Sequence, residues 1–304
     1  MVKALVVVNP AAGGGRSKSR LPLIKQILAK IGIDAVYEQT TGPRDATRIA
    51  REAASGNNYD LIVAAGGDGT VHEVANGLIG SDISLGCLPS GTGNDITSSF
   101  GIPMDTAAAC RLLRRGKRRK MDAGCITHKR GKQFFLGVTG IGYDAEVTKA
   151  ANELGKRFMT GTLPYMVAIF RVLRKFEPIE FELASKELKA SFEAMLVSVG
   201  NGPMYGGHMK ICPNAKLDDH LFDLTILGKV SRFHLMQLFT LVYSGKHIEH
   251  HSVGTKKIPE FTISSNRPTL VQADGEILGY LPMKFETIPN ALSVVTGDTP
   301  YFVH

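Results

Sequence analysis

The chain has 304 residues, a mass of 32.8 kDa and a formal net charge of +8 at pH 7. With 43% hydrophobic residues and no low-complexity tract, the composition fits a folded globular protein, preferably of two ordinary domains, and does not indicate disorder. The excess of cations favours anionic partners such as nucleotides, nucleic acid or acidic lipid surfaces.

The cysteines indicate the cellular compartment, and the apolar stretches indicate whether the chain spans a membrane. The four cysteines are widely spaced without a C-x-x-C pair, so they suggest neither a zinc site nor a disulfide framework and fit a reducing cytosol. The chain starts with a strand-like segment, and no signal peptide is expected. The longest apolar stretches, around Tyr165 to Phe170 and Leu235 to Tyr243, are too short or too interrupted to span a bilayer. Any membrane contact is therefore expected to be peripheral.

The first predicted unit joins a strand to a helix through glycine. Lys3 to Val8 form a buried-strand pattern, the loop Asn9 to Gly15 follows, and a helical pattern runs from Leu23 to Ile31. The loop has neither a G-K-[ST] ending nor G-x-G-x-x-G spacing, so taken alone it is as consistent with a plain connection as with a binding loop. A strand over Ile33 to Glu38 and a helix over Asp45 to Ala54 continue the alternation.

The segment Asp60 to Leu78 carries the strongest local signal. An apolar run, Leu61 to Ala65, predicts a strand buried on both faces and stopped by two glycines. Thr70 and Glu73 have the spacing of a capping box, followed by apolar residues at helical spacing. A helix is therefore predicted to start at Thr70.

This strand-to-helix joint is predicted to bind phosphate. The first turn of the helix offers unpaired N–H groups, and the glycines place no Cβ in the way of a close approach. Asp68 would repel a polyphosphate unless a cation or a transferable proton lies between them, which favours Mg²⁺ or chemistry over simple anion storage. For an isolated match, a plain tight turn is the alternative.

The remaining elements indicate the fold class. Ser84 to Leu88 is a fourth strand and ends in the glycine-rich segment Pro89 to Asp95. Four strands alternating with helices predict an α/β domain with a parallel, Rossmann-like sheet and its ligand loops at one edge. From Met121 onward short β-type runs predominate, which predicts a mainly antiparallel β domain. The expected domains are a nucleotide-binding domain, residues 1–122 with 297–304 returning to it, and a β-rich substrate domain, residues 123–296.

Several patterns have a structural and a functional interpretation. Six cations occur in the seven residues from Arg114 to Lys120, which suit a solvated helix end or contact with an anionic bilayer. Nucleic acid is not expected, since no aromatic residues interleave the run. His247, His250 and His251 are interpreted as surface or loop residues and not as a metal cluster, because no cysteine or carboxylate completes a metal shell. The apolar stretches Met159 to Phe176 and Phe233 to Tyr243 predict core or cleft-lining helices, with lipid-chain contact as the alternative.

Five motifs follow one another along the chain. They are NPAAGG at 9–14, GGDGT at 66–70, SGTGND at 90–95, PNAKLDD at 213–219 and DGE at 274–276. Together they resemble the bacterial diacylglycerol kinase-like lipid kinases, relatives of sphingosine and ceramide kinases, over nearly the whole chain. GGDGT alone is only moderately specific, since NAD kinases and phosphofructokinases carry the same or a similar turn.

The resemblance implies a site for ATP and Mg²⁺ in a cleft between the two domains. Glu276 matches the general base, Asp274 its neighbour, and Asp68 a carboxylate in the Mg²⁺ and water network beside the phosphates. Lys216, Asp219 and Leu221 match a structural Mg²⁺ site, in which the first and last contribute carbonyl oxygens. The positions that match ATP-binding residues are Asn9, Pro10, Ala11, Ala12, Gly13, Thr40, Gly66, Gly67, Asp68, Gly69, Thr70, Val71, His72, Glu73 and Thr92.

The sequence thus predicts an ATP- and Mg²⁺-dependent lipid kinase that converts diacylglycerol to phosphatidic acid. Alternatives are a kinase for another lipid alcohol, such as phosphatidylglycerol or a sphingoid base, an NAD kinase-like enzyme with a soluble substrate, and a nucleotide or lipid sensor without turnover. Phosphoryl transfer needs positioning and positive potential more than covalent help, which the glycine loops, the metal and a carboxylate base supply. The expected location is the cytoplasm, with peripheral attachment to the inner face of the membrane; whether a homodimer forms is left open.

Overall fold

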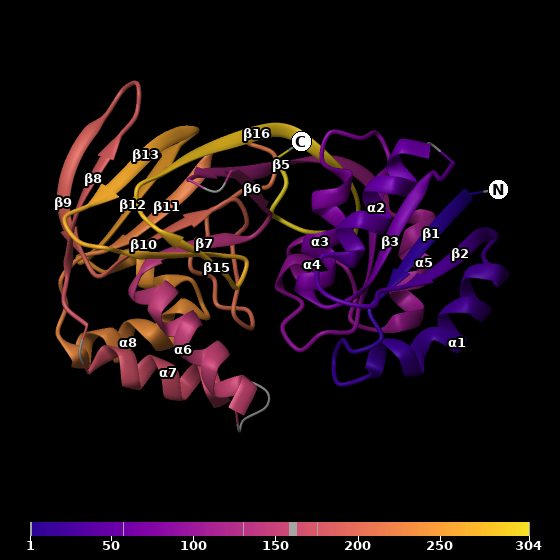
Figure 1. Ribbon diagram of the computed structural model, residues 1–304, viewed down its shortest axis with the longest axis horizontal. Helices are drawn as coiled ribbons and strands as arrows, with labels where there is room; N and C mark the ends of the chain where they lie inside the picture. Colours follow the sequence, from indigo (N-terminus) through magenta and orange to yellow (C-terminus); the bar gives the residue numbers. More distant parts are fainter. Residues whose placement is uncertain (1, 57, 130, 158–162, 175, 304) are drawn as a thin grey trace. The chain divides into compact units, whose positions relative to one another are not determined.

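The computed structural model describes residues 2–56, 58–129, 131–157, 163–174 and 176–303, which form two compact units (Figure 1). Unit 1 comprises residues 1–123, 217–219 and 289–304, and unit 2 comprises residues 124–216 and 220–288. The chain passes from one unit to the other within strand β5 (Lys117–His128), near residue 217, near residue 220 and within strand β16 (Met283–Thr296). The domain ranges given above stay a prediction.

Unit 1 has a parallel sheet in the order β2-β1-β3-β4, extended by the end of β16 beside β4. Its central strands β3 and β4 are buried throughout, as their continuous apolar runs predict, whereas in the edge strand β2 only Ile33 is buried and the other residues are half-buried or exposed. The strands are β1 Val2–Val8, β2 Ile33–Gln39, β3 Leu61–Gly66 and β4 Ser84–Pro89, and the helices are α1 Arg16–Lys30, α2 Asp45–Gly56, α3 Asp68–Leu78, α4 Asp95–Ser99 and α5 Thr106–Arg115.

The strand order of unit 1 reverses between β1 and β3. From β1 the chain moves outward to β2, and from there it crosses back to β3 and β4. Helix α2 packs beside α3, and α1 packs beside α5, as expected of a doubly wound sheet. In such sheets ligands bind outside the carboxyl ends of the strands, where the order reverses. The α/β prediction with a parallel, Rossmann-like sheet is confirmed.

Unit 2 is mainly antiparallel, as predicted. One sheet has the order β12-β11-β10-β7-β14-β15, and the other strands of the unit pair as β16-β13-β8-β9 and β5-β6. The strands are β6 Gly131–Phe135, β7 Val138–Gly142, β8 Ile179–Ala184, β9 Lys189–Ala194, β10 Leu196–Gly200, β11 Phe222–Leu227, β12 Val253–Ile258, β13 Glu260–Ser265, β14 Leu270–Ala273 and β15 Glu276–Tyr280. The helices are α6 Tyr143–Arg157, α7 Leu163–Leu173 and α8 Arg232–Val242, with a 3-10 helix η1 Lys246–Glu249.

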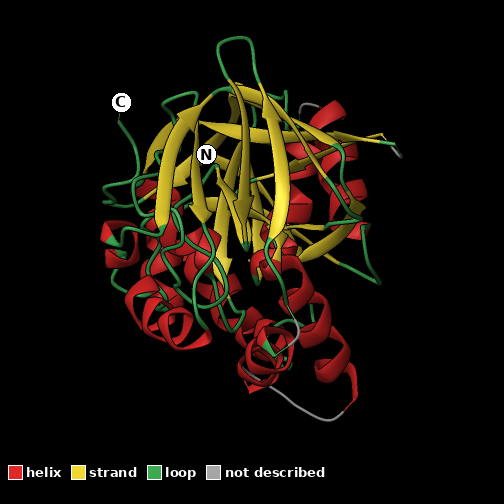
Figure 2. Ribbon diagram, turned by 90° about the vertical axis from the view of Figure 1, so that its left-hand side faces the viewer, coloured by secondary structure: helices red, strands yellow, loops and turns green. Residues whose placement is uncertain are grey.

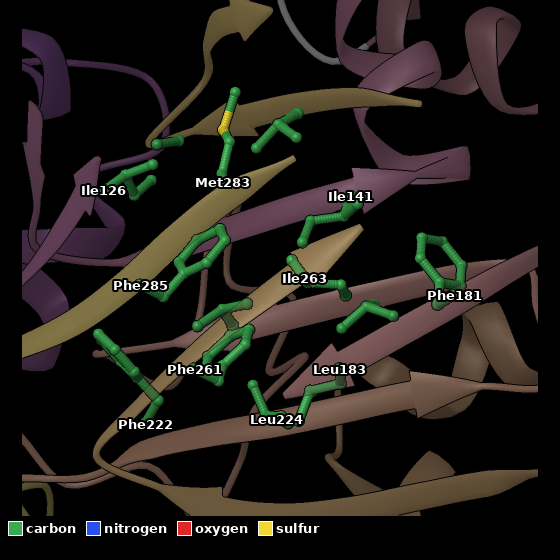
Figure 3. Close-up of a cluster of buried hydrophobic side chains, with 14 of the residues drawn as sticks. Ile126, Ile141, Phe181, Leu183, Phe222, Leu224, Phe261, Ile263, Met283 and Phe285 are labelled. Atoms are coloured by element: carbon green, nitrogen blue, oxygen red, sulfur yellow. The ribbon is translucent and has the colours of Figure 1, made fainter. Parts of the chain in front are cut away.

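The core of unit 2 lies between its two layers of strands (Figure 3). Phe261 stacks on Phe285 at 4.9 Å between ring centroids and meets Phe222 edge-on at 6.3 Å. Residues that alternate with this core point the other way, toward α6, α7 and α8, which form a second apolar cluster around Tyr143 and Leu238. Figure 1 shows these three helices grouped on one side of the strands of the unit, and Figure 2 distinguishes the helices (red) from the strands (yellow) of the whole chain.

The structure differs from two of the predicted segments, the basic run and the apolar stretch 159–176. The basic run is not simply a helix end, because Arg114 and Arg115 close α5 whereas Lys117 to Lys120 begin strand β5. The predicted apolar stretch 159–176 lies partly outside the described residues, and its described part contains α7. In the described part of the chain, no helix is both long enough and apolar enough to cross a bilayer.

Replacement of Phe261 by alanine should destabilise unit 2. The side chain is 2% exposed and contacts two other rings, so its removal leaves a cavity and should lower the free energy of unfolding by about 3 to 5 kcal/mol. Urea denaturation followed by circular dichroism measures the loss. Phe233→Ala, at a position that is 67% exposed, is the control and should change stability by less than about 0.5 kcal/mol. Equal losses in both variants would contradict this account of the core.

Candidate functional site

The loops after β1 and β3 meet where the strand order of unit 1 reverses. The backbone N–H of Asn9 donates to the carbonyl oxygen of Ala65 (3.0 Å). The side-chain amide of Asn9 donates to the hydroxyl of Thr70 (3.0 Å), and its Oδ1 accepts from the N–H of Ala11 (3.1 Å). One asparagine therefore fixes the first glycine loop against the start of helix α3.

Glycine allows the loop after β4 to approach the same place. A Cβ on Gly13, where φ is +61°, would lie 1.9 Å from the carbonyl oxygen of Ser90. The backbones of Gly67 and Gly91 are also in contact, since a Cβ on Gly91 would lie 2.6 Å from the Cα of Gly67. The three loops thus form one surface of backbone groups, which suits polyphosphate because no side chain holds the ligand away.

Arg16, at the start of α1, joins two of these loops. Its Nε donates to the carbonyl oxygen of Gly13 (3.0 Å) and its Nη2 to that of Gly91 (2.9 Å). Arg16 is not among the site residues predicted from the sequence. Its only sequence signal is a cation directly after a glycine-rich loop, and nothing local reveals that its partner lies 75 residues away.

Helix α3 begins at Asp68, so the predicted start at Thr70 is wrong. Gly67 is the N-cap residue and makes no side-chain cap. Thr70 instead uses its hydroxyl toward Asn9, and Glu73 accepts from the N–H of Ala46 at the start of α2 (3.2 Å). The capping-box spacing is therefore present without a capping box, because both side chains have partners on other elements.

Asp68 lies at the edge of this backbone surface. Its Oδ1 accepts from the N–H of Ile96 (3.0 Å), and a Cβ on Gly93 would lie 3.1 Å from Asp68 Oδ2 and 3.2 Å from Asp95 Oδ2. Burial raises the pKa of the Asp68 carboxyl group to about 6, and the negative charge of Asp95 adds to this increase. Hydrogen bonds from the backbone N–H groups of residues 94–96 lower the pKa, but by less. Two carboxyl groups beside a phosphate surface are the kind of donor set that a hard cation neutralises.

The other predicted ATP-binding residues of unit 1 differ in exposure. Thr92 is exposed, and Thr40, whose N–H donates to Val8, is half-buried at the end of β2. Val71 and His72 are buried in α3, where the side chain of Asn76 contacts the ring and carbonyl oxygen of His72. The unit therefore brings the loop residues together, while these two helix residues lie beneath them.

The DGE motif forms a tight hairpin in unit 2. Asp274 and Gly275 have φ of +46° and +88° and connect β14 to β15 as a two-residue turn. Both carboxylate oxygens of Asp274 accept backbone hydrogen bonds, from Leu136 (2.8 Å) and Gly137 (2.9 Å). Glu276, the first residue of β15, is exposed. The turn thus holds the carboxylate of Asp274 by hydrogen bonds and leaves the carboxylate of Glu276 exposed to solvent.

A buried polar network supports this turn, and its residues are not among those predicted from the sequence. Gln272 accepts from the N–H of Gly275 (2.9 Å) and donates to Asp144 Oδ2 (2.9 Å), whose other oxygen accepts from the hydroxyl of Tyr205. A Cβ on Gly140 would lie 1.5 Å from Asp144 Oδ2, so glycine is required there. Partners this far apart in the chain leave no local sequence signal.

An apolar pocket of about 310 Å³ lies between the helices and the sheet of unit 2. Helices α7 and α8 supply Leu173 and Leu238, and the network supplies Asp144 and Tyr205 at its wall. His247 also lines the pocket and is buried, so its predicted surface position is wrong. Burial lowers its pKa; the ring is therefore neutral and donates through Nε2 to the carbonyl oxygen of Ile211 (3.1 Å).

The predicted metal-binding segment lies where the chain enters unit 1 and leaves it again. Lys216, Asp219 and Leu221 are half-buried. The adjacent Asp218 accepts from the N–H of Val303 (2.6 Å), which fixes the C-terminal segment. In the part of the chain that the structure describes, no group of three or more histidine, cysteine or acidic side chains could hold a metal. A cation here would depend mainly on carbonyl oxygens.

Comparison with known proteins gives matches over both units. Residues 3–126 match the family described as "Diacylglycerol kinase catalytic domain", and residues 137–296 match "YegS C-terminal NAD kinase beta sandwich-like domain". A Mycobacterium tuberculosis protein named diacylglycerol kinase is 32% identical, with 96% of this chain and 94% of the relative covered. A diacylglycerol kinase of Bacillus subtilis (strain 168) is also 32% identical, with 97% and 96% covered.

Solved structures agree with these matches. A crystal structure of a diacylglycerol kinase from Bacillus anthracis str. Sterne superposes with a TM-score of 0.74 at 25% identity. A second structure from the same organism superposes with a TM-score of 0.80 at 29% identity. Each comparison covers 97% of both chains.

The raised pKa of Asp68 predicts that an uncharged side chain stabilises the ligand-free protein. Because the pKa is higher in the folded state, ionisation costs folding free energy as the pH rises from about 4 to above 6. Asp68→Asn should therefore be more stable than wild type at pH 8, by about 1 to 3 kcal/mol, and the gain should shrink toward pH 4.5.

Urea denaturation at both pH values, without nucleotide, measures this difference. Asp34→Asn, at an exposed position on β2, is the control and should show no such dependence. A gain in stability for Asp68→Asn that is the same at both pH values would contradict the explanation by ionisation.

Proposed function

Because this chain belongs to the diacylglycerol kinase family and is a kinase, we propose that it transfers the γ-phosphate of ATP to the hydroxyl group of diacylglycerol, giving phosphatidic acid. The observation that carries the choice of a lipid is the pocket of unit 2. Its surface is almost entirely apolar, which suits an acyl chain and would leave the polar groups of a soluble nucleotide such as NAD without partners.

ATP binds through the glycine loops of unit 1 in this proposal. The N–H groups of the loops and of the first turn of α3 receive the phosphates, as predicted for the residues from Asn9 to Gly13 and from Gly66 to Glu73. The closeness of the Gly13, Gly67 and Gly91 backbones supports this, because it leaves a continuous surface without side chains. Arg16 adds a positive charge to that surface.

Glu276 takes the proton of the attacking hydroxyl. Asp274 is the less suitable base, because both of its oxygens already accept backbone hydrogen bonds, and it acts by holding the turn. Glu276 is exposed on the rigid hairpin and is free to turn toward an acceptor. The network of Gln272 and Asp144 keeps the turn in place.

Mg²⁺ is the cofactor in this proposal, and when bound it neutralises charge on the phosphates. Asp68 would hold this ion, and the proximity of Asp95 together with the raised pKa of Asp68 fits a place where negative charge needs a cation. Lys216, Asp219 and Leu221 would hold a second, structural Mg²⁺ through oxygen atoms. The enzyme works in the cytoplasm and attaches peripherally to the inner face of the membrane.

A substrate screen tests the assignment. The protein, labelled ATP and Mg²⁺ are incubated with diacylglycerol, phosphatidylglycerol, sphingosine or NAD, and mass spectrometry identifies the labelled product. The proposal expects phosphatidic acid as the main product. Labelled NADP would support the soluble-substrate alternative, and saturable ATP binding without transfer to any acceptor would support a sensor.

Glu276→Gln should lower kcat by about 10²- to 10⁴-fold, because general base catalysis contributes this much and the amide cannot accept the proton. The fold should persist, since the side chain is exposed. Activity is measured with diacylglycerol in detergent micelles. Glu193→Gln, at another exposed position of unit 2, is the control and should retain wild-type activity. Near-normal turnover in Glu276→Gln would remove this residue from the mechanism.

Leu238→Phe should alter the preference for chain length, because Leu238 lines the apolar pocket from α8 and a larger side chain there shortens the space. Activity on long-chain diacylglycerol in micelles should fall about tenfold relative to activity on a short-chain diacylglycerol. Leu241→Phe lies on the same helix but does not line the pocket, and it should keep the wild-type ratio. An unchanged ratio in Leu238→Phe would place the acyl chain elsewhere.

A further inference from the structure

A second cavity of unit 2, here named the charged cavity, has a volume of about 610 Å³ and is separate from the apolar pocket. Helix α6 contributes Glu146, Lys149 and Glu153, which recur at i, i+3 and i+7 and therefore share one face of the helix. The buried side chains of Ile179 and Leu270 also line the cavity. Its volume is in the range of sites for small molecules.

The charged side chains of this cavity have both signs. Three are acids and three are cations, namely Glu146, Glu153 and Glu177, and Lys149, Arg171 and Arg267. In the part of the chain that the structure describes, none of the six forms an ion pair, and Arg267 instead donates to the carbonyl oxygens of Glu177 and Pro178. Charges of both signs that surround one space without pairing are complementary to a ligand that also carries both.

The types of these side chains indicate the class of ligand. The guanidinium group of Arg171 suits a carboxylate or a phosphate, which it can bind with two parallel hydrogen bonds. Glu146 and Glu153 suit an ammonium group, which has three donors and no acceptor. The apolar side chains of Ile179 and Leu270 suit a short hydrocarbon segment between the two charged groups. A zwitterion with no net charge therefore matches three acids and three cations.

The two elements that hold the DGE turn both reach the charged cavity. On α6, Asp144 accepts from Gln272, and the side chain of Asn152 donates to the carbonyl oxygen of Gly275 (3.4 Å). Asp144 and Asn152, at i and i+8, lie on a different face of the helix from the residues that line the cavity. Strand β14 begins at Leu270 in the cavity wall and leads into the turn. A ligand in the cavity would thus contact both α6 and β14.

We propose that the charged cavity binds a small zwitterion, a molecule with one ammonium group and one carboxylate or phosphate group, and that its binding increases the rate of phosphoryl transfer. The ligand holds α6 and β14 in one arrangement, so that the turn presents Glu276 in a larger fraction of the molecules. The effect on the rate rests on the proposed function, whereas the binding is independent of any reaction.

Isothermal titration calorimetry of the full chain tests the binding. The probes are the ω-amino acids from glycine to 6-aminohexanoate, each compared with the alkanoate and the alkylammonium ion of the same length. At least one amino acid should bind about tenfold more tightly than both comparison compounds, because each of these lacks one of the two charges. The proposal is overturned if every amino acid binds more weakly than about 10 mM, or if an alkanoate binds as tightly.

Neutral variants identify the two charged halves of the site. Lys149→Gln with Arg171→Gln should weaken binding of the amino acid about tenfold and leave binding of the alkylammonium ion unchanged. Glu146→Gln with Glu153→Gln should weaken it to a similar extent and leave binding of the alkanoate unchanged. Retention of one probe by each variant shows that the cavity is still folded. Arg118→Gln, at an exposed position on β5, is the control and should bind as wild type does. Unchanged affinity for the amino acid in both double variants would place the ligand elsewhere.

Kinase assays with diacylglycerol in micelles test the effect on the rate. A saturating amino acid should raise kcat about fivefold. Asn152→Ala should bind the amino acid as wild type does but lose this increase, because the contact between α6 and Gly275 is removed. Binding to wild type without a change in rate would refute the regulation. A protein that binds the amino acid but phosphorylates no lipid would refute the proposed function and confirm the binding site.

Discussion

Direct contact between backbones is the constraint on which the candidate site of unit 1 depends. The loops that carry Gly13, Gly67 and Gly91 approach until a Cβ on any of them would meet a neighbouring main-chain atom, at 1.9 Å in the case of Gly13. A surface of this kind consists of N–H and carbonyl groups whose directions are set by the fold and not by rotamers. The reversal of strand order between β1 and β3 brings the first two loops together, and the hydrogen bonds of Asn9 and Arg16 fix their spacing.

A carboxylate in such a place lowers stability. Asp68 is removed from water beside Asp95, and its raised pKa shows that three backbone N–H groups do not fully compensate. An asparagine could accept the same bond from Ile96 without the charge, so folding alone does not account for an acid at this position. A bound cation and polyphosphate would stabilise the ionised carboxylate, so the folded protein would be most stable with these ligands bound.

Much of the fold could be predicted from local patterns, whereas the contacts of the site could not. The continuous apolar runs of β3 and β4 and the alternation with helices indicated a parallel sheet, because burial on both faces leaves that signature. The capping-box spacing of Thr70 and Glu73 gave a wrong start for helix α3, since both side chains form hydrogen bonds with other elements. Arg16, Gln272 and Asp144 were missed for the same reason: their partners are far away in the chain, and spacing alone carries no information about them.

The DGE turn and the apolar pocket of unit 2 belong to one hydrogen-bonded structure. Gln272 joins the N–H of Gly275 in the turn to the carboxylate of Asp144, and Asp144 with Tyr205 forms part of the pocket wall. Gly140 leaves the space that this carboxylate occupies. Separation of the wall from the turn would leave buried polar groups without partners and cost stability, so this network holds the two in one arrangement. A lipid that is held by its chain would therefore present its hydroxyl at a fixed distance from the turn, so that binding energy far from the reacting atoms contributes to their alignment.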